Sequence, residues 1–536
     1  MSMRFARSVA TALCVGGFAF RGSHAQSTSS LSAKLAEIAR RPELVHATFG
    51  VAAYDLESKQ MVFGLNAEQL FTPGSTTKLL TMGTALGLLG ADHRFRTPVY
   101  RTGPIVGGVV RGDLVIVASG DPNLSGRILG DTLGFSNADH SYAGRGDSIA
   151  KAIGDPLMVM REFATQIAAK GIKQVDGRIL VDLSLFPQGD RELGTGVVIS
   201  PIVVNDNVVD LLITPGTKPG EPAVLRVSPD LGVFKIANEV VTGPPHSAST
   251  LRRMMARDSA TGSVTVRVSG TYAADAAPSV MNVVVDDPAE LAIRGLTAAL
   301  RDRGIVVRDA ASVAPAARPD FVKLAASYGD STRVAEHVSL PLSEEIKVTL
   351  KVSQNLHASM MPYVIGAIAG KTPGRGALQA GFDAERDFLQ RAGLDLIAAA
   401  QGDGAGGAPG AFYSPAFMVQ YLAYMASRAD IALFRRALPI LGRDGTLWNI
   451  QPQSPAAGSV IAKTGTFSLV DPLNRRTIIT GKGLAGYMTT SSGRRLAFAI
   501  YANRIPFPPN YQGDAALLVG QALGEIASAM WGSPMM

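Results

Sequence analysis

The middle of the chain differs from its two ends in its pattern of predicted strands, turns and helices, and this difference constrains the fold more than any other feature. Between residues 97 and 326, short strand-like runs such as 114–118 and 264–268 alternate with turns rich in Gly, Pro and Asp. The segments on either side instead combine helical patterns with a few alternating strands. We therefore expect one domain whose two halves are separated in the sequence by a large insertion.

Both ends of the chain carry elements that suit one sheet flanked by helices. The residues that follow Ser75 are apolar nearly all round a helix, which predicts a buried helix. Ser491-Ser-Gly-Arg suits a hairpin turn between the last two strands. Helices are expected at 31–41, 75–89, 343–356, 415–428 and 515–530, and strands at 48–55, 61–65, 459–464, 482–489 and 495–501.

The change in residue pattern also sets the expected domain boundaries. Residues 26–96 and 327–536 form the interrupted domain. The insertion divides into an α/β domain, with helices at 161–170 and 290–303, and a second domain rich in β-strands. A stretch rich in Ala and Pro at 310–320 is the expected return linker. The two inserted domains are expected at 97–188 with 278–326, and at 189–277.

The N-terminus predicts export from the cytoplasm. Arg4 and Arg7 precede a short apolar run, and Ser23 and Ala25 supply small residues after it. These features are typical of a cleaved secretory signal peptide, here residues 1–25. A retained anchor is the alternative, but the run is shorter than the ~20 apolar residues that span a bilayer. We expect the mature protein in the periplasm.

Residue usage excludes several classes of function. Cys14, the only cysteine, lies within the predicted signal peptide, so the mature chain has no disulfide, cysteine nucleophile or Cys-ligated metal. The seven histidines form no His-x-x-x-His pair and no Gly-rich phosphate loop is present, so we expect no metal and no cofactor. Loss of Arg4, Arg7 and Arg21 lowers the formal charge from +7 to +4 without a basic cluster, which argues against nucleic acid. The helix expected at 515–530 could touch a membrane surface, so we expect at most peripheral membrane contact.

Ser75-Thr-Thr-Lys78 is the first candidate for chemistry. A serine hydroxyl is a weak nucleophile and needs an adjacent base. Residues three apart on a helix share a face, so Lys78 can reach the Ser75 hydroxyl. The same helix is apolar, and burial lowers a lysine pKa because it disfavours the ammonium form. Alone, the pattern Ser-x-x-Lys also fits an ordinary helix start.

Ser353-Gln354-Asn355 is the second candidate and lies at the end of the helix expected at 343–356. The serine could relay a proton between the first serine, the lysine and a leaving amine. The asparagine could donate to a substrate carbonyl. Helix capping explains the same residues equally well when they are taken alone.

Lys463-Thr464-Gly465-Thr466 is the third candidate and lies on an expected strand. A glycine in a strand lets a ligand backbone approach closely. The lysine and the two threonine hydroxyls could hold a carboxylate. An ordinary lysine on an edge strand is the alternative.

All three motifs occur in the order found in penicillin-recognising serine enzymes. The chain as a whole resembles the class C low-molecular-mass penicillin-binding proteins of peptidase family S13, the D-alanyl-D-alanine carboxypeptidase/endopeptidases. That family inserts a large region between its first two motifs, and about 270 residues separate Lys78 from Ser353 here. The resemblance also rests on Gly120-Asp-Pro-Asn-Leu, Gly177-Arg-Ile-Leu-Val-Asp, Val204-Asn-Asp-Asn, Asp444-Gly-Thr-Leu, Ala462-Lys-Thr-Gly-Thr and Leu484-Ala-Gly-Tyr.

The resemblance implies an α/β (α+β) fold of the serine β-lactamase and DD-peptidase kind. Its antiparallel sheet would be flanked by helices and interrupted by the α/β and β-rich insertion. The resemblance also implies acyl transfer on peptidoglycan stem peptides that end in D-Ala-D-Ala, with β-lactams as covalent inhibitors.

Site residues follow from the same resemblance. Ser75 would be acylated, Lys78 would be its base, and Ser353 would complete the proton transfers. The backbone N–H groups of Ser75 and Thr466 would form an oxyanion hole. Asp182 resembles a residue of the inserted region that faces the substrate side chain, although a structural Asp at a strand end fits equally. The residues implied for substrate binding are Asn355, Lys463, Thr464, Gly465, Thr466 and Asp182.

The sequence departs from the family pattern near these motifs. Gln354 replaces the usual Asp, the segment 403–409 lacks a serine and an arginine, and Ile450 replaces another arginine. An additional segment at 468–481 separates the third motif from the next strand. Two alternatives stay open. One is a β-lactamase or esterase of the same superfamily, which a Tyr-x-Asn second motif or a deacylating Glu would favour; the other is an idle wall-binding protein whose motifs are relics, which the altered segment 403–409 favours.

Overall fold

The computed structural model describes residues 25–137, 139–145, 154–308, 319–371 and 374–533. The signal peptide predicted at 1–25, apart from its last residue, lies outside the described residues, as does most of the linker predicted at 310–320. None of the described helices has both the length and the apolar character needed to cross a membrane.

A five-stranded antiparallel sheet joins the two ends of the chain. Its strand order is β2-β1-β23-β22-β21, so the N-terminal hairpin pairs with the last strand of the sequence. The predicted antiparallel sheet flanked by helices is confirmed. Its strands are β1 (Thr48–Asp55), β2 (Gln60–Leu65), β21 (Val460–Asp471), β22 (Arg476–Thr489) and β23 (Arg495–Pro506).

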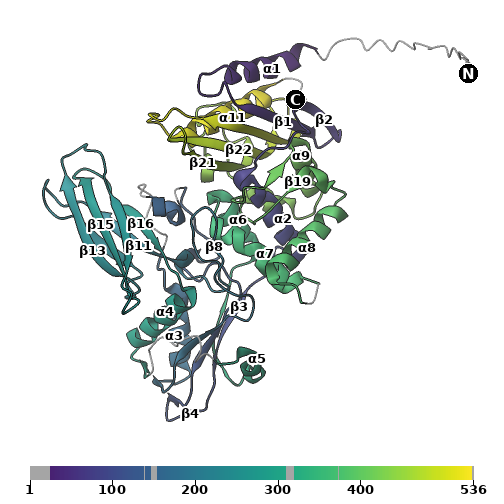
Figure 1. Ribbon diagram of the computed structural model, residues 1–536. Coiled ribbons are helices and arrows are strands. Elements are labelled where there is room, and N and C mark those ends of the chain that lie inside the picture. The colour runs from purple at the N-terminus through teal and green to yellow at the C-terminus, as the bar shows by residue number, and fades with distance from the viewer. Residues whose placement is uncertain (1–24, 138, 146–153, 309–318, 372–373, 534–536) are drawn as a thin grey trace, which may run out of the picture.

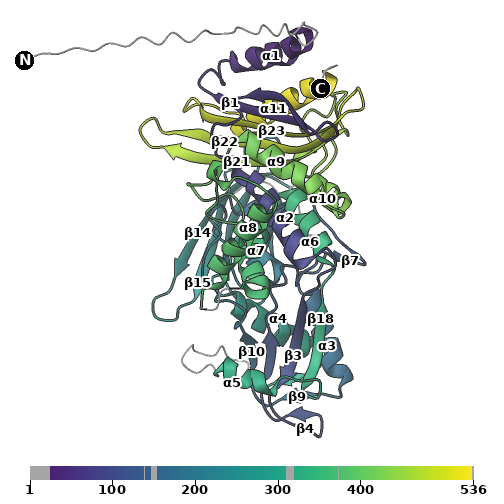
Figure 2. The ribbon, with the colours of Figure 1, turned by 90° about the vertical axis from the view of Figure 1, so that its right-hand side faces the viewer.

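Helices cover both faces of this sheet (Figures 1 and 2). α1 (Ala25–Ala39) and α11 (Ala515–Gly532) pack on one face, where Phe498 and Ile526 belong to one buried cluster. α2 (Lys78–Leu89) lies under the other face and is largely buried, as its apolar sequence predicts. The other helices on this side are α6 (Leu342–Val352), α7 (Asn355–Ala369), α8 (Ala377–Arg391), α9 (Pro415–Ala426) and α10 (Ile431–Ala437).

Two predicted helices differ from the structure in a way that shapes the site. Ser75 lies in a 3₁₀ turn, η1 (Gly74–Thr77), that leads into α2. The helix predicted at 343–356 is two helices, because Ser353 adopts a left-handed conformation (φ 63°) that ends α6. The second motif therefore lies in a sharp turn, and Asn355 begins α7.

The additional segment predicted at 468–481 forms the outer part of a hairpin. β21 and β22 are longer than predicted and pair as far as Asp471 and Arg476. A turn at 472–475 closes this hairpin. The third motif and the strand that follows it are thus two arms of one long hairpin.

The insertion lies on the far side of the α2 layer from the five-stranded sheet (Figure 2). Its α/β portion contains a sheet of order β10-β6-β3-β18, with α3 and α4 beside it, and its β-rich portion contains two three-stranded sheets, β12-β11-β16 and β13-β15-β14. The α/β elements are β3 (Arg96–Arg101), β6 (Leu114–Val117), α3 (Met158–Ala169), β10 (Ile179–Asp182), α4 (Pro288–Asp302) and β18 (Arg333–Val338). The β-rich elements are β11 (Val208–Thr214), β12 (Val224–Ser228), β13 (Lys235–Gly243), β14 (Arg252–Arg257), β15 (Val264–Ala273) and β16 (Ser279–Val284).

The remaining elements are short. Those of the insertion and its return are β4 (Ile105–Val106), β5 (Val109–Val110), β7 (Ile128–Leu129), β8 (Thr132–Leu133), β9 (Gln174–Val175), β17 (Val306–Val307) and α5 (Phe321–Leu324). β19 (Ala399–Ala400) and β20 (Phe412–Tyr413) form a two-stranded sheet beside the helices.

The sheets cross two of the predicted domain boundaries. β18 follows residue 327 yet pairs with β3, and β16 pairs with β11 across the boundary predicted after residue 277. One buried cluster also contains both Ile116 and Val266, so the two predicted inserted domains share a core. We propose that residues 96–338 form a single inserted unit with a β-rich extension.

Candidate active site

The three predicted motifs meet at a cavity of about 520 Å³. The turn η1 contributes Ser75, and the edge strand β21 contributes Thr464 and Thr466. Ser353 comes from the turn after α6, and Asn355 from the first position of α7. The wall also contains residues of the insertion, of the loop at 405–407, of the segment 446–450, of β22 and of α11. Segments that are far apart in the sequence therefore meet at one cavity, as the resemblance based on the three motifs predicts.

Two glycines let the first and third motifs touch through their backbones. Gly74 has φ 50°, and a Cβ there would come within 2.6 Å of the Thr466 nitrogen. A Cβ on Gly465 would overlap the Pro73 carbonyl oxygen and come within 3.1 Å of the Ser75 nitrogen. A larger residue at either position would push η1 and β21 apart. The backbone N–H groups of Ser75 and Thr466 are thereby kept close to one another.

Lys78 is fully buried beside Ser75. Its Nζ lies 2.8 Å from Ser75 Oγ and donates to Asn355 Oδ1 (2.6 Å) and to the Ala405 carbonyl (3.1 Å). Burial lowers the pKa of Lys78 to about 8, although nearby carboxylates oppose the shift. A neutral amine has two N–H groups and one lone pair. Because both N–H groups have acceptors, the lone pair is left for the Ser75 hydroxyl.

A second serine–lysine pair joins the second and third motifs. Lys463 Nζ donates to Ser353 Oγ (2.7 Å) and to the Thr464 carbonyl (2.8 Å), and the lysine is fully buried. Burial, together with the charges of Lys78 and Lys482, lowers the pKa of Lys463 well below its ordinary value. Lys463 thus lies behind the cavity wall and holds Ser353 in place.

Asn355 and Tyr142 connect the second motif to the insertion. Asn355 Oδ1 accepts from Lys78 at the start of α7. Tyr142 lies in a 3₁₀ turn of the insertion, η2 (His140–Arg145), and its hydroxyl donates to the Ser353 carbonyl. The same hydroxyl lies 3.1 Å from Asn355 Oδ1. Sequence reasoning missed Tyr142, since no local pattern marks it as a cavity residue.

The hydroxyls of the third motif have partners from outside the three motifs. Thr464 Oγ1 lies 2.8 Å from Thr446 Oγ1, and Thr466 Oγ1 accepts from Lys482 Nζ at 2.7 Å. Thr446 belongs to the stretch Asp444-Gly-Thr-Leu, and Lys482 opens the strand predicted at 482–489. The sequence marked both stretches but assigned no role to either residue.

Asp182 is not part of this arrangement. It ends β10, is buried, and does not line the cavity. Its carboxylate accepts from the Ser184 N–H (2.9 Å), the Ser184 hydroxyl (2.5 Å) and the Tyr328 hydroxyl (3.0 Å). The structure therefore does not bring Asp182 to the cavity, and its partners fit the structural Asp at a strand end that the sequence also allowed.

The segments that depart from the family pattern still support the site. Asp403 accepts from two backbone N–H groups of its own loop (2.8 and 3.1 Å), and this loop presents the Ala405 carbonyl to Lys78. Ile450 lines the cavity. Gln354 is buried, and its side chain accepts from a backbone N–H of α7. The altered segments therefore leave the Ser75–Lys78 contact intact.

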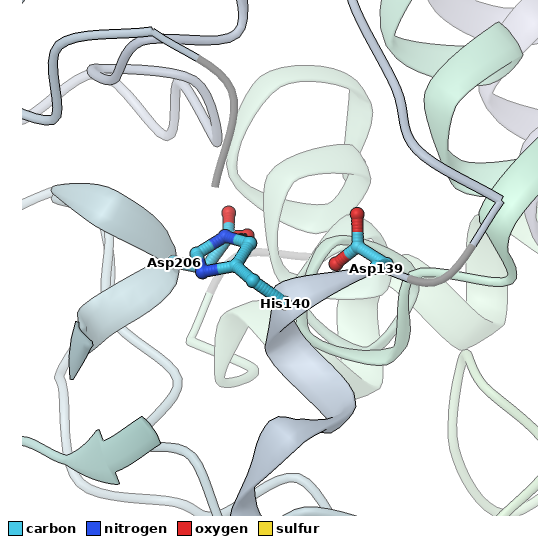
Figure 3. Close-up of side chains that lie close together, drawn as sticks. All are labelled: Asp139, His140 and Asp206. Atoms are coloured by element: carbon cyan, nitrogen blue, oxygen red, sulfur yellow. Dashed lines mark hydrogen bonds and ion pairs between the residues drawn. The ribbon is translucent and has the colours of Figure 1, made fainter. Parts of the chain in front are cut away.

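A buried cluster beside the cavity has the composition of a metal site. Asp139, His140 and Asp206 lie close together (Figure 3), and each offers a ligand atom within 4.8 Å of the others. However, the Arg127 guanidinium donates to both Asp139 (3.0 Å) and Asp206 (2.6 Å). His140 contacts Asp206 and Asp210 through its two ring nitrogens. A guanidinium keeps its charge in proteins, so we interpret the cluster as an ion-pair network.

The same network reaches α7 through His357. His357 Nε2 lies 2.9 Å from Asp206, and its Nδ1 lies 3.0 Å from Glu345 of α6. Burial alone would lower the pKa of His357, but these two carboxylates raise it to about 9. The network thus ties the insertion to the two helices that flank the second motif.

The fold and the site together define a class of protein. An antiparallel sheet between helices, a serine beside a buried lysine at a helix start, and Lys-Thr-Gly on the edge strand are features of penicillin-recognising serine enzymes. A sequence profile of the D-Ala-D-Ala carboxypeptidase 3 (S13) family matches residues 31–517. The chain therefore belongs to this family of serine-type hydrolases, and the resemblance found in the sequence is confirmed.

Named relatives are similar over most of the chain. A D-alanyl-D-alanine carboxypeptidase of an Actinomadura species is 28% identical over 503 residues, which cover 90% of this chain and 81% of the relative. The D-alanyl-D-alanine carboxypeptidase DacB of Haemophilus influenzae is 24% identical over 467 residues, which cover 85% of each chain.

Solved structures agree on the fold. The crystal structure of penicillin binding protein 4 from Haemophilus influenzae has a TM-score of 0.67 and 22% identity, and the match covers 93% of this chain and 99% of that one. A structure of the same protein complexed with a novel β-lactam has a TM-score of 0.65 and 21% identity, and covers 94% and 99%. At these identities the likeness shows the fold alone.

Proposed function

We propose that this protein is a serine D-alanyl-D-alanine carboxypeptidase and endopeptidase of peptidoglycan, and that β-lactams acylate it. The observation that carries the proposal is the 2.8 Å separation of Ser75 Oγ and Lys78 Nζ in a cavity that Thr464 and Thr466 also line. Membership of the S13 family and similarity to named D-alanyl-D-alanine carboxypeptidases support the same activity.

In the proposed reaction, Ser75 attacks the carbonyl carbon of the penultimate D-alanine. Lys78 accepts the hydroxyl proton on its lone pair, an ester forms, and the bond to the leaving amine breaks. Ser353 relays the proton that Lys78 accepted to that amine, and Lys463, whose Nζ donates to Ser353 Oγ at 2.7 Å, holds Ser353 in place for this transfer. Water then hydrolyses the ester, which releases the shortened peptide and restores the serine. A positioned base of this kind contributes about 10²–10⁴-fold.

Substrate orientation is assigned to the edge strand and the second motif. The N–H groups of Ser75 and Thr466 form the proposed oxyanion hole, which the backbone approach at Gly465 supports. The hydroxyls of Thr464 and Thr466 bind the terminal carboxylate of the stem peptide. Asn355 donates to a substrate carbonyl through its amide.

The proposed place of action is the periplasm. The positive start, the short apolar run and the small residues before the expected cleavage point support removal of residues 1–25 during export. The proposed substrate lies outside the cytoplasm, which fits the same compartment.

Labelling with a fluorescent penicillin tests the proposal. The wild-type protein should give a labelled band and release D-alanine from a peptide that ends in D-Ala-D-Ala. Ser75→Ala should abolish both signals, while Ser58→Ala, at an exposed serine of the β1–β2 turn, should change neither. Intact mass and peptide mapping should place the adduct on Ser75. No band from the folded wild type would instead support an idle wall-binding protein.

The rival activity within the superfamily has its own readout. A β-lactamase hydrolyses the acyl-enzyme quickly, so fast turnover of nitrocefin without release of D-alanine would favour it. We expect a long-lived penicillin adduct instead.

A further inference from the structure

A third lysine enters the cavity from the strand next to the third motif. Lys482 lies on β22, directly opposite Thr466 of β21 in the sheet register. The residue is only 8% exposed, yet it forms part of the cavity lining. Lysines are seldom buried in this way unless their charge has a partner.

The hydrogen-bond partner of Lys482 is neutral. Its Nζ donates to Thr466 Oγ1 at 2.7 Å, and within the described ranges no Asp or Glu forms an ion pair with it. Asp514, which caps α11 and accepts from the Leu517 N–H, acts on Lys482 only through its charge. Burial lowers the pKa of Lys482 to about 8 and Asp514 opposes that shift, so the group is mostly charged at pH 7.

The position of Lys482 is fixed by α11 as well as by Thr466. A Cβ at Gly520 would lie 3.5 Å from Lys482 Cε and 3.8 Å from its Nζ, so the helix backbone packs against the end of the lysine. The ammonium group is therefore held beside a hydroxyl that faces the cavity, and Thr466 itself is exposed.

Lys463 is less suited to attract an anion into the cavity. It is fully buried, its Nζ donates to Ser353 and to a backbone carbonyl, and it does not line the cavity. Burial lowers its pKa well below the ordinary value, which reduces its charge. The positive charge next to Thr466 therefore comes from Lys482.

We propose that Lys482 supplies the positive charge of the carboxylate subsite, so that the enzyme selects substrates whose leaving residue carries a free carboxylate. This inference rests on the proposed function. A carboxylate that accepts from Thr466 Oγ1 lies within about 6 Å of Nζ, because two hydrogen-bond lengths separate them at most. The cavity excludes part of the solvent, so the attraction is stronger than it would be on an open surface.

Two matched substrates test this inference. One peptide ends in D-Ala-D-Ala with a free carboxylate, and the other ends in the corresponding amide. The measurement is kcat/KM for each, followed by release of D-alanine or of D-alaninamide. Lys482→Met should lower the acid-to-amide ratio by about 10- to 100-fold, the effect of losing a unit charge within about 6 Å of the carboxylate in a partly solvent-excluded cavity. Lys482→Arg should retain most of the ratio.

The controls separate this inference from the function on which it rests. Lys323→Met removes the same charge from an 85% exposed lysine of the insertion and should leave the ratio unchanged. Both rates come from one preparation, so a smaller folded fraction cancels in the ratio. An unchanged ratio in Lys482→Met, with an active wild type, overturns the inference and leaves the proposed function standing. A wild type that neither binds penicillin nor releases D-alanine overturns both.

Discussion

Two neighbouring regions of the molecule bury ionisable side chains almost completely. In one region burial sets the direction of the pKa shifts, and in the other the charged partners set it. Around the cavity, Lys78, Lys463 and Lys482 are 0%, 0% and 8% exposed, and the hydrogen-bond partners described above are hydroxyl, amide and carbonyl oxygens. In the network beside it, Asp206 is 1% exposed and His357 0%, but each bonds to a group of opposite charge. Burial is the same in both regions, and the partners differ.

The difference appears in the direction of the pKa shifts. Burial lowers the pKa of Lys78 and of Lys482 to about 8. The charges of nearby carboxylates raise these pKa values by less than burial lowers them. In the network, burial alone would raise the pKa of Asp206, but Arg127 and the two histidines lower it well below its ordinary value. His140 has its pKa raised well above the ordinary value by Asp210 and Asp206, against burial. Burial without an ion pair therefore lets Lys78 act as a base, whereas burial beside groups of opposite charge stabilises the fold.

The largest expected effect concerns the base. Lys78→Met keeps the apolar packing but removes the amine beside Ser75. We expect the second-order rate of acylation by fluorescent penicillin to fall by about 10²–10⁴-fold. Lys323→Met is the control and should acylate at the wild-type rate. A Lys78→Met rate within tenfold of wild type would show that another group activates Ser75.

The next effect concerns the paired region. His357→Leu leaves Asp206 and Glu345 buried without this cation, so we expect the free energy of unfolding in urea to fall by about 3–5 kcal/mol. Arg267→Met breaks the exposed pair with Glu239 and should cost less than about 1 kcal/mol. Equal costs for the two variants would contradict the contrast between the regions.

The pH dependence of stability sharpens the same contrast. The pKa of His357 is raised from 6.5 to about 9, so the folded state binds the proton more tightly than the unfolded state. The stability that protonation contributes is fully present below about pH 6.5 and is lost as the pH rises through about 9. We expect the difference in unfolding free energy between wild type and His357→Gln to shrink by on the order of 3 kcal/mol across this range. A difference that does not vary with pH would sink this assignment.

The smallest of these effects is the pH dependence of acylation. Lys78 acts as a base only when neutral, and its pKa is about 8. The acylation rate should therefore rise about 50-fold between pH 6 and pH 8 and level off above. Stopped-flow measurement with a penicillin provides the profile. A rate that falls over this range would require Lys78 to act in its charged form.

Local pattern predicted much of the fold and the core of the site. Residues 48–65 alternate as a hairpin and form β1 and β2, and the apolar run after Ser75 forms the buried helix α2. Ser75 and Lys78 meet because a spacing of three residues brings side chains together in any helical turn. The motif order then predicted which distant segments share the cavity, through the resemblance to a family.

Other features depended on packing that no local pattern encodes. The sequence could not show that Ser353 turns left-handed and splits the helix predicted at 343–356. Nor could it show that the Asp182 carboxylate accepts hydrogen bonds from Ser184 and Tyr328 instead of lining the cavity.

The sequence by itself determined the interrupted architecture, the three motifs and the pairing of Ser75 with Lys78, because these follow from periodicity and spacing along the chain. The tertiary structure alone decided which lysine lies beside Thr466, which carboxylates neutralise His357, and that Tyr142 contacts the second motif. The physical reason is that burial and charge partners are contributed by remote segments. The pKa of a buried group depends on those neighbours and not on its place in a motif.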